Sequence, residues 1–136
     1  MIVADTSGLL ALFNARELRH DDVRRVVERE PEPLVVSPFV VAELDYLLAT
    51  RLGVDAELRV LRELAGGAYH LALMQEDDLR TAAAVVERYR DQDVGVADAS
   101  LVVLASRHRT KSVLTLDHRH FTVLRPIEGG RFRLLP

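Results

Sequence analysis

Short continuous runs of apolar residues alternate with longer stretches of mixed polar and apolar residues along this 136-residue chain. Runs of this kind, bounded by polar or turn-forming residues, are typical of strands that are buried on both faces. They predict strands at residues 2–4, 34–37, 69–73 and 112–116, with weaker candidates at 121–124 and 132–134.

The longer stretches between these runs carry helix signals. Ser37 followed by Pro38 is a typical helix start, because Ser caps free backbone N–H groups and Pro fits the first turn. Gly53 is typical of a helix end. The hydroxyls of Thr6 and Ser7 are candidate caps for a helix after the first strand. Helices are predicted at residues 8–14, 20–30, 38–52, 55–65, 76–90 and 94–109.

The alternation of buried strands with helices predicts an α/β fold, a three-layer α/β/α sandwich with a mostly parallel sheet. The length is that of one domain, so residues 1–136 are expected to form a single unit. In such sheets ligands bind beyond the carboxyl ends of the strands. Polar residues that directly follow a strand are therefore candidates for function.

Two aspartates occupy that position. Asp5 ends the first apolar run and Asp117 ends the run at 112–116. Since parallel strands share one carboxyl edge, both side chains are expected at the same edge of the sheet. The alternative for either residue is capping of the next helix, which Asp does well.

Two further acids lie within apolar helical segments. Asp98 has apolar neighbours three and four residues away, and a carboxylate in such surroundings costs several kcal/mol unless it is paired or bound to a metal. The alternative is an exposed position in the first helical turn, which the helix dipole favours. Glu43 and Asp45 both have apolar neighbours on one helix, and the spacing does not choose between them.

Carboxylates gathered in one place repel one another, and a divalent cation relieves that repulsion. Ligand sets made only of oxygen favour Mg²⁺ or Mn²⁺, the cations of phosphate chemistry. A cation held in this way activates water and stabilises charge in a displacement at phosphorus. The pattern therefore predicts a metal centre for phosphodiester hydrolysis.

Four segments, taken in order, resemble the acidic motifs of PIN domains, and the resemblance covers nearly the whole chain. They are DTSGLLAL at 5–12, VVAELDYLL at 40–48, VGVADASLVVLA at 94–105 and VLTLDHRHF at 113–121. The resemblance implies a metal-dependent endoribonuclease similar to VapC-type toxins. It also implies that the metal site comprises Asp5, Glu43, Asp98 and Asp117, with Glu43 favoured over Asp45.

The resemblance carries further expectations. It implies an RNA substrate, a small antitoxin partner and a homodimer. Hydrogen bonds from Thr6, Ser7 and Thr115 are expected to support the site. Some family members carry one more acid, for which Asp91 and Asp93 are available, although Asp93 is also placed to cap the next helix. The alternative function is a PIN-like module that binds RNA or protein without cleaving it.

The net charge of −3 conceals a basic segment at residues 107–133, which carries +5 and leaves −8 on the remainder. A basic region on an acidic protein steers polyanions, although a solvated surface has the same composition. Within this segment His118 and Arg119 follow Asp117 and are candidate contacts for RNA phosphate.

Other chemistries find no support in the sequence. There is no cysteine, which excludes disulfides and thiolate sites, and no apolar run long enough for a membrane span. A cytoplasmic protein is expected, since the N-terminus also lacks a secretory pattern. DTSG at 5–8 lacks the second Asp of a haloacid-dehalogenase-like phosphatase, and no nucleophile elbow or phosphate-binding loop is present.

Overall fold

The computed structural model describes all 136 residues, which form five strands and seven α-helices with one short 3₁₀ turn, η1. The strands are β1 (Val3–Ala4), β2 (Val35–Val36), β3 (His70–Leu71), β4 (Ser112–Leu114) and β5 (Arg133–Leu135). The helices are α1 (Thr6–Phe13), α2 (His20–Arg29), α3 (Pro38–Leu52), α4 (Val54–Ala65), α5 (Glu76–Arg88), η1 (Arg90–Gln92), α6 (Val96–Arg107) and α7 (His118–Phe121).

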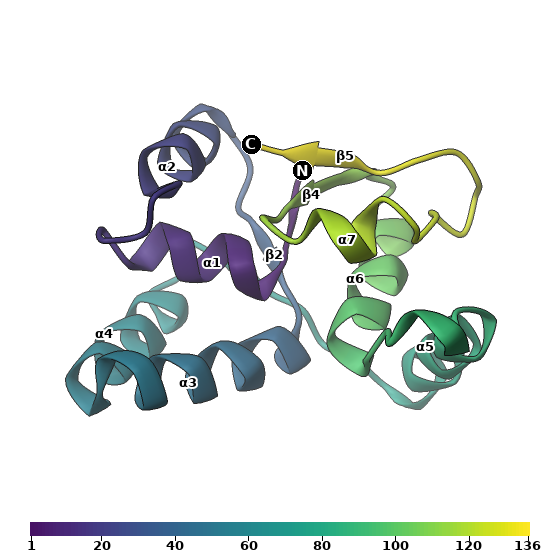
Figure 1. The fold of residues 1–136 in the computed structure, drawn as a ribbon, viewed down its shortest axis with the longest axis horizontal. Coiled ribbons are helices and arrows are strands. Elements are labelled where there is room, and N and C mark those ends of the chain that lie inside the picture. Colours follow the sequence, from purple (N-terminus) through teal and green to yellow (C-terminus); the bar gives the residue numbers. More distant parts are fainter.

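The strands form one sheet in the order β3-β2-β1-β4-β5, and every neighbouring pair is parallel. Helices α1 and α2 lie on one side of this sheet and α5 and α6 on the other, as Figure 1 shows. The predicted α/β class is therefore confirmed. Helix α3 starts at the carboxyl end of β2 and runs beneath α1, away from α6, in the view of Figure 1.

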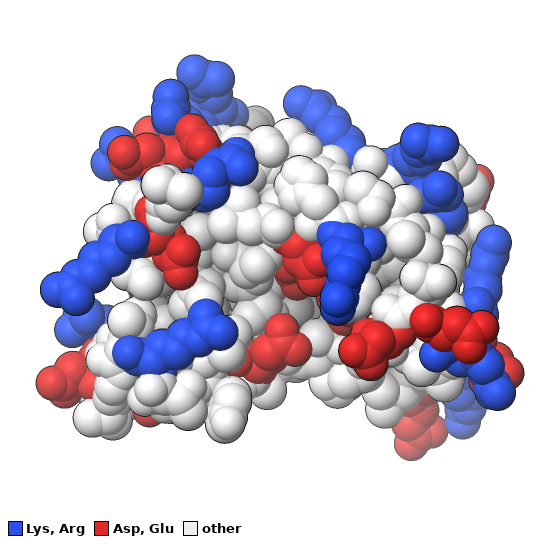
Figure 2. All heavy atoms as spheres, in the orientation of Figure 1, with Lys and Arg blue, Asp and Glu red and all other residues white.

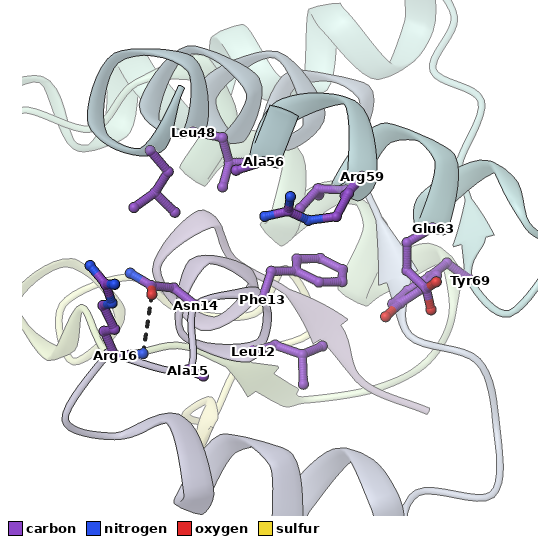
Figure 3. A pocket seen from close by; sticks show the side chains of 12 residues that line it. Leu12, Phe13, Asn14, Ala15, Arg16, Leu48, Ala56, Arg59, Glu63 and Tyr69 are labelled. Atoms are coloured by element: carbon purple, nitrogen blue, oxygen red, sulfur yellow. Dashed lines mark hydrogen bonds between the residues drawn. The ribbon is translucent and has the colours of Figure 1, made fainter. Parts of the chain in front are cut away.

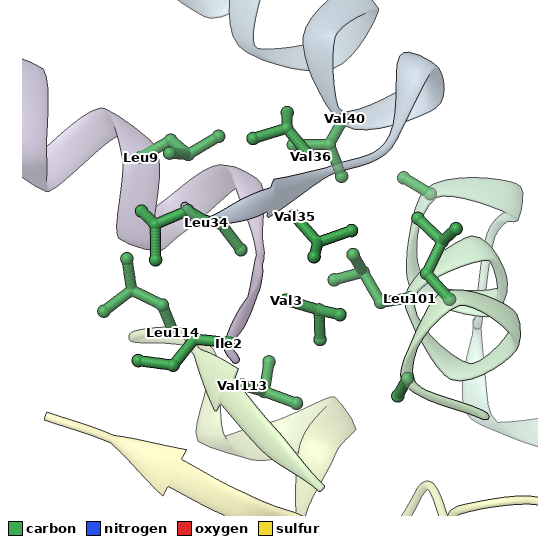
Figure 4. Packing of buried hydrophobic residues seen from close by; sticks show 14 of the residues in the cluster. Ile2, Val3, Leu9, Leu34, Val35, Val36, Val40, Leu101, Val113 and Leu114 are labelled. Atoms are coloured by element: carbon green, nitrogen blue, oxygen red, sulfur yellow. The ribbon is translucent and has the colours of Figure 1, made fainter. Parts of the chain in front are cut away.

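The core lies between the sheet and the helices on both of its faces. Val3 pairs with Val35 and with Val113, so these three side chains form a row across the central strands. Figure 4 shows the row directed toward Leu101 of α6, while neighbouring residues of the same strands point toward Leu9 of α1. All five residues are completely buried. Burial on both faces explains why these strands read as continuous apolar runs.

The predicted ends of α3 are confirmed. The Ser37 hydroxyl accepts a hydrogen bond from the backbone N–H of Phe39 at 3.2 Å, and Gly53 ends the helix with φ at 90°. The expected caps at Thr6 and Ser7 are wrong, because α1 begins at Thr6 itself and Asp5 takes the capping position. The Ser7 hydroxyl is directed across the sheet edge instead, toward the loop after β4.

The weak strand candidate at 121–124 is also wrong. Phe121 ends the short helix α7, and the backbone N–H groups of the next three residues bond to carbonyls within that helix. The candidate at 132–134 corresponds to β5, which begins and ends one residue later than expected and pairs with β4. No helix of the structure combines the length and apolar character needed to cross a membrane.

Candidate metal centre

A cleft of about 620 Å³ opens beyond the carboxyl ends of β1 and β4. Its walls come from the start of α1, from α3, from the start of α6 and from the segment after β4. Figure 2 shows acidic side chains gathered in the middle of this face, with basic side chains on either side. The four predicted acids, Asp5, Glu43, Asp98 and Asp117, all line the cleft.

Two hydroxyls orient the carboxylate of Asp5. Ser7 and Thr115 donate hydrogen bonds to its Oδ2 atom, at 2.7 and 2.8 Å. The same hydroxyls accept hydrogen bonds from the backbone N–H groups of Leu116 and Asp117, both at 2.9 Å. This network ties the start of α1 to the segment after β4. It also leaves Oδ1 of Asp5 without a hydrogen bond and free to bind a ligand.

A histidine joins Asp117 to Asp98. The Nδ1 atom of His120 lies 3.0 Å from Oδ2 of Asp117 and 3.3 Å from Oδ2 of Asp98. Its Nε2 atom lies 3.5 Å from the guanidinium of Arg119. Because both carboxylates accept hydrogen bonds, Nδ1 carries a proton that is directed toward them. Asp117 also caps α7, accepting a hydrogen bond from the backbone N–H of His120.

The surroundings of Asp98 in the cleft disfavour its charged form. Its side chain is only 17% exposed, and its pKa is raised from 3.8 to about 6, chiefly by this burial. Repulsion from Asp5 adds to the rise in pKa, as do smaller contributions from Asp117 and Glu43, while His120 acts in the opposite direction. Three carboxylates thus destabilise the charged form of a fourth. A cation placed among them would remove this penalty.

The two acids of α3 are directed to different surroundings. Glu43 is exposed at the cleft, whereas Asp45 contacts Glu57 on α4. A hydrogen bond between these two carboxyl groups raises the pKa of Glu57, and their repulsion adds to the effect. The geometry therefore singles out Glu43 as the acid of α3 that faces the cleft, a choice that periodicity alone left open.

A buried hydroxyl pair links the helices that carry Glu43 and Asp98. The Oγ atoms of Ser37 and Ser100 lie 2.7 Å apart, and both residues are completely buried. Ser100 also donates to the backbone carbonyl of Ala97, at 2.6 Å. The N-terminus of α3 is thereby anchored to the first turns of α6, which sets the separation of their two acids.

The other residues named from the sequence take varied positions. Thr6 lines the cleft, but its buried hydroxyl has no hydrogen-bond partner, so the expected supporting bond is absent. Asp93 lines the cleft and does not occupy the capping position of α6. Asp91 and Arg119 lie beside it, around a smaller adjoining hollow. His118 is exposed and lines neither cavity.

Sequence reasoning missed two residues of the cleft. His120 appeared only within the segment VLTLDHRHF, with no role assigned to it in the metal site, and Arg51 was not among the candidates. The spacing of Arg51, eight residues after Glu43 on one helix, was an available signal. The position of His120 depends on the turn of α7, which the sequence did not predict.

The donor chemistry of the cleft fits a divalent cation such as Mg²⁺ or Mn²⁺. All four acids offer hard oxygen ligands, and their mutual repulsion is what a cation neutralises. The side chains do not yet form a closed coordination shell, since no three acidic or histidine side chains are already arranged around one point. Cation binding therefore requires the carboxylates to draw together.

A second cavity of about 740 Å³ lies between the end of α1 and helices α3 and α4. Figure 3 shows Phe13, Tyr69 and Leu12 along its wall, with Arg59 and Glu63 on α4. Burial raises the pKa of Tyr69, and repulsion by Glu63 adds to this rise. The cavity is larger than the acidic cleft but contains none of its four acids, so it lacks the groups for phosphodiester chemistry.

The chain is similar to known proteins in both sequence and fold. The family model described as PIN domain matches residues 2–125. The chain is 57% identical over 135 residues to Ribonuclease VapC26 of Mycobacterium tuberculosis, covering 99% of this chain and all of that protein.

Solved structures share the fold at lower sequence identity. VapC20 of M. tuberculosis, described as a toxin that cleaves the sarcin–ricin loop, superposes with a TM-score of 0.80 at 22% identity, over 87% of this chain and 91% of that one. A toxin–antitoxin complex from Klebsiella pneumoniae has a TM-score of 0.69 at 19% identity, over 89% and 90% of the two chains. With the family model covering most of the sequence, the chain belongs to the PIN-domain family.

Proposed function

We propose that this protein is a metal-dependent endoribonuclease and the toxin of a toxin–antitoxin pair. The observation that carries the proposal is the convergence of Asp5, Glu43, Asp98 and Asp117 on one cleft. The 57% identity to a protein named Ribonuclease VapC26 supports RNA as the substrate. No side chain in the cleft is arranged as an activated nucleophile, which favours attack by water.

The chemistry divides between the cation and the side chains. Asp5, Asp98 and Asp117 are the proposed main ligands of Mg²⁺ or Mn²⁺, with Glu43 as a ligand or a base. A bound cation of this kind supplies activation of water and stabilisation of charge on the leaving oxygen. Asp5 presents its free Oδ1 atom to the cleft because Ser7 and Thr115 hold Oδ2. We assign both hydroxyls a supporting role on this basis.

The side chains around the proposed ligands have separate roles. His120 bridges them through Nδ1 and maintains their spacing while no cation is bound. Asp98, with a pKa of about 6, is mostly ionised at neutral pH and available as a ligand. Glu43 is exposed at the cleft and can exchange protons with water. Arg119, beside the cleft, and His118 are the proposed contacts for RNA phosphate.

The assembly is inferred from relatives. The fold resembles that of a chain in a toxin–antitoxin complex from Klebsiella pneumoniae, which supports a small antitoxin as partner. We further infer a homodimer, a single domain over residues 1–136 and action in the cytoplasm, where an RNA substrate is accessible.

The direct test is cleavage of total RNA by the purified protein. Cleavage is expected with Mg²⁺ or Mn²⁺ and should stop in EDTA. Glu43→Gln should reduce the rate by at least about a hundredfold, the scale of losing a group that acts in general acid–base or electrostatic catalysis. Asp45→Asn is the matched control on the same helix and should retain most activity, because Asp45 faces Glu57.

Three outcomes would contradict parts of this proposal. Equal cleavage in EDTA would exclude the metal mechanism. Loss of activity in Asp45→Asn, but not in Glu43→Gln, would show that the wrong acid of α3 was assigned. Binding of RNA without cleavage under any cation would favour the alternative, an inactive PIN-like binding module. The sarcin–ricin loop, which VapC20 cleaves, is a defined RNA to include among the probes.

A further inference from the structure

One arginine lines a cleft whose other charged side chains are carboxylates. Arg51 shares the cleft with Asp5, Glu43, Asp98 and Asp117, while His120 is the only other basic residue there. Counting Asp93 as well, five acids face one guanidinium. The net negative charge of the cleft therefore repels a polyanion. The positive charge of Arg51, fixed at one place in the cleft, affects where RNA can enter.

The helical register of α3 directs Arg51 to the cleft. Residues Glu43, Leu47 and Arg51 follow one another at intervals of four, which places them on one helix face, and all three line the cavity. At a rise of about 1.5 Å per residue, Arg51 lies roughly 12 Å from Glu43 along the helix axis. Figure 1 shows α3 running away from α6, so this is the end of the cleft remote from Asp98.

The guanidinium of Arg51 is not used within the protein. It takes part in no salt bridge and no hydrogen bond, and the side chain is exposed. Some other arginines near acids are paired, for example Arg25 with Asp22 at 2.8 Å and Arg19 with Asp22 at 2.7 Å. An unpaired guanidinium beside a metal-ligand cleft is available for a phosphate, which it binds through two parallel N–H groups.

The helix dipole offers a simpler reason for a basic residue at this position. Arg51 is in the last turn of α3, where a positive charge is favourable. Arg62 occupies the last turn of α4 in the same way, is also exposed, and lines neither the acidic cleft nor the second cavity. The two residues share the dipole effect and differ in facing the cleft. Arg62 is therefore a matched control.

We propose that Arg51 binds a phosphate of the RNA strand next to the scissile one, and so sets where the strand lies in the cleft. This inference rests on the proposed ribonuclease function. The distance from Glu43 assigns Arg51 to a neighbouring phosphate and not to the reacting group. Arg51 is thus a substrate-positioning residue whose contribution lies in binding.

The test compares Arg51→Gln, Arg51→Lys and Arg62→Gln with the wild type. The substrate is a labelled single-stranded RNA that carries a cleavage site mapped in total RNA, with Mn²⁺ present. Arg51→Gln is expected to raise KM about tenfold with little change in kcat, the scale of one lost charge-assisted hydrogen bond. The slope of log(kcat/KM) against log[salt] should become shallower by about 0.7, as for one lost phosphate contact on a single strand.

The controls separate binding from stability and from general charge. Arg62→Gln should show the wild-type KM and salt slope, and both glutamine variants should melt at similar temperatures, since each loses one dipole interaction. Arg51→Lys should restore most of the salt slope, because it keeps the charge.

The outcomes distinguish this inference from the function it rests on. Absence of cleavage by the wild type would overturn the ribonuclease proposal itself. Cleavage by the wild type, with Arg51→Gln and Arg62→Gln identical in KM and salt slope, would overturn only the role of Arg51. A fall in kcat at unchanged KM would also overturn it, since Arg51 would then act on the reacting phosphate.

Discussion

Among individual residues, the hydroxyls of Ser7 and Thr115 have the clearest effect on the site. A buried carboxylate such as Asp5, which is 5% exposed, is costly unless it is hydrogen-bonded. Both hydroxyls satisfy the same oxygen, Oδ2, and leave the other oxygen to the cleft. Ser7 and Thr115 are 108 positions apart in the sequence, so only the pairing of β1 with β4 brings them together.

The acids of the site could be predicted from the sequence more readily than the residues that surround them. Asp5 and Asp117 were found because they follow buried strands, a rule that depends only on sheet geometry. Glu43 was separated from Asp45 by family resemblance and not by periodicity. Arg51 was missed because charge was counted along the chain, where it stands outside the basic segment at 107–133. Such a count does not reveal which face a helical residue takes.

The raised pKa of Asp98 predicts how this residue affects stability without metal. Its pKa is about 6 in the folded protein and near 3.8 when unfolded, so the folded state holds the proton more tightly. Stability should therefore fall as pH rises from about 4 through about 6, and remain lower above that range. The fall is expected to reach at most about 3 kcal/mol, since one pKa unit corresponds to about 1.4 kcal/mol.

Asp98→Asn tests this directly. In EDTA at pH 7.5 the variant should melt at or above the wild type, and this advantage should disappear at pH 4.5, where native Asp98 is protonated. Mn²⁺ should reverse the order, because a ligand at a hundredfold excess over Kd adds about 2.7 kcal/mol to a native state that binds it. A variant that melts far below the wild type in EDTA, and responds equally to Mn²⁺, would make Asp98 a structural residue.

Among the elements, those with strong end signals were predicted best. Helix α3 has Ser37 and Pro38 at one end and Gly53 at the other, and its bounds were predicted correctly. The segment 121–124 failed because its apolar residues suggested a strand, while the capping of α7 by Asp117 holds the chain in a helical turn. The hydrogen bond between Asp117 and the start of α7 thus outweighed the hydrophobic pattern of the segment. The same helical turn places His120 in the site.

The packing of α1 on β4 depends on a glycine. A Cβ atom at Gly8 would lie 2.6 Å from the backbone carbonyl oxygen of Leu114, which no rotamer change relieves. Gly8→Ala should therefore destabilise the protein by about 1–3 kcal/mol, as overpacking does, although alanine favours helix by up to about 1 kcal/mol. Urea unfolding in EDTA measures the change. Cleavage should also fall, because Ser7 would shift with the helix.

Gly95→Ser provides the comparison for Gly8→Ala. Gly95 has extended backbone at the start of α6, with φ at −95°, and no atom lies within 4 Å of an added Cβ. Serine also caps helices well, so the free energy of unfolding should change by less than about 0.5 kcal/mol. Equal stability of Gly8→Ala and the wild type would mean that α1 can move away from β4 without loss.

Across the whole molecule, folding disperses the basic segment at 107–133. Arg107 is paired with Asp78 and also donates to the backbone carbonyl of Leu73. Arg125 donates to the carbonyl of Thr122 at 2.7 Å. Two of the seven arginines and lysines in this segment are therefore engaged within the fold. The expected steering of RNA depends on the few arginines that remain free around the acidic cleft.

An uninhibited nuclease should stop growth when it is expressed alone, whereas Glu43→Gln at the same level should not. Co-expression with the proposed antitoxin should restore growth. Reducing the free enzyme to about a thousandth, at partner concentrations near 1 μM, requires a Kd on the order of 1 nM. That affinity would add about 4 kcal/mol to the stability of the native state, so the co-purified complex should melt well above the free chain.

Growth inhibition by Glu43→Gln would show that toxicity does not come from cleavage. Failure of the proposed antitoxin to form a complex would instead favour a nuclease that acts without an antitoxin.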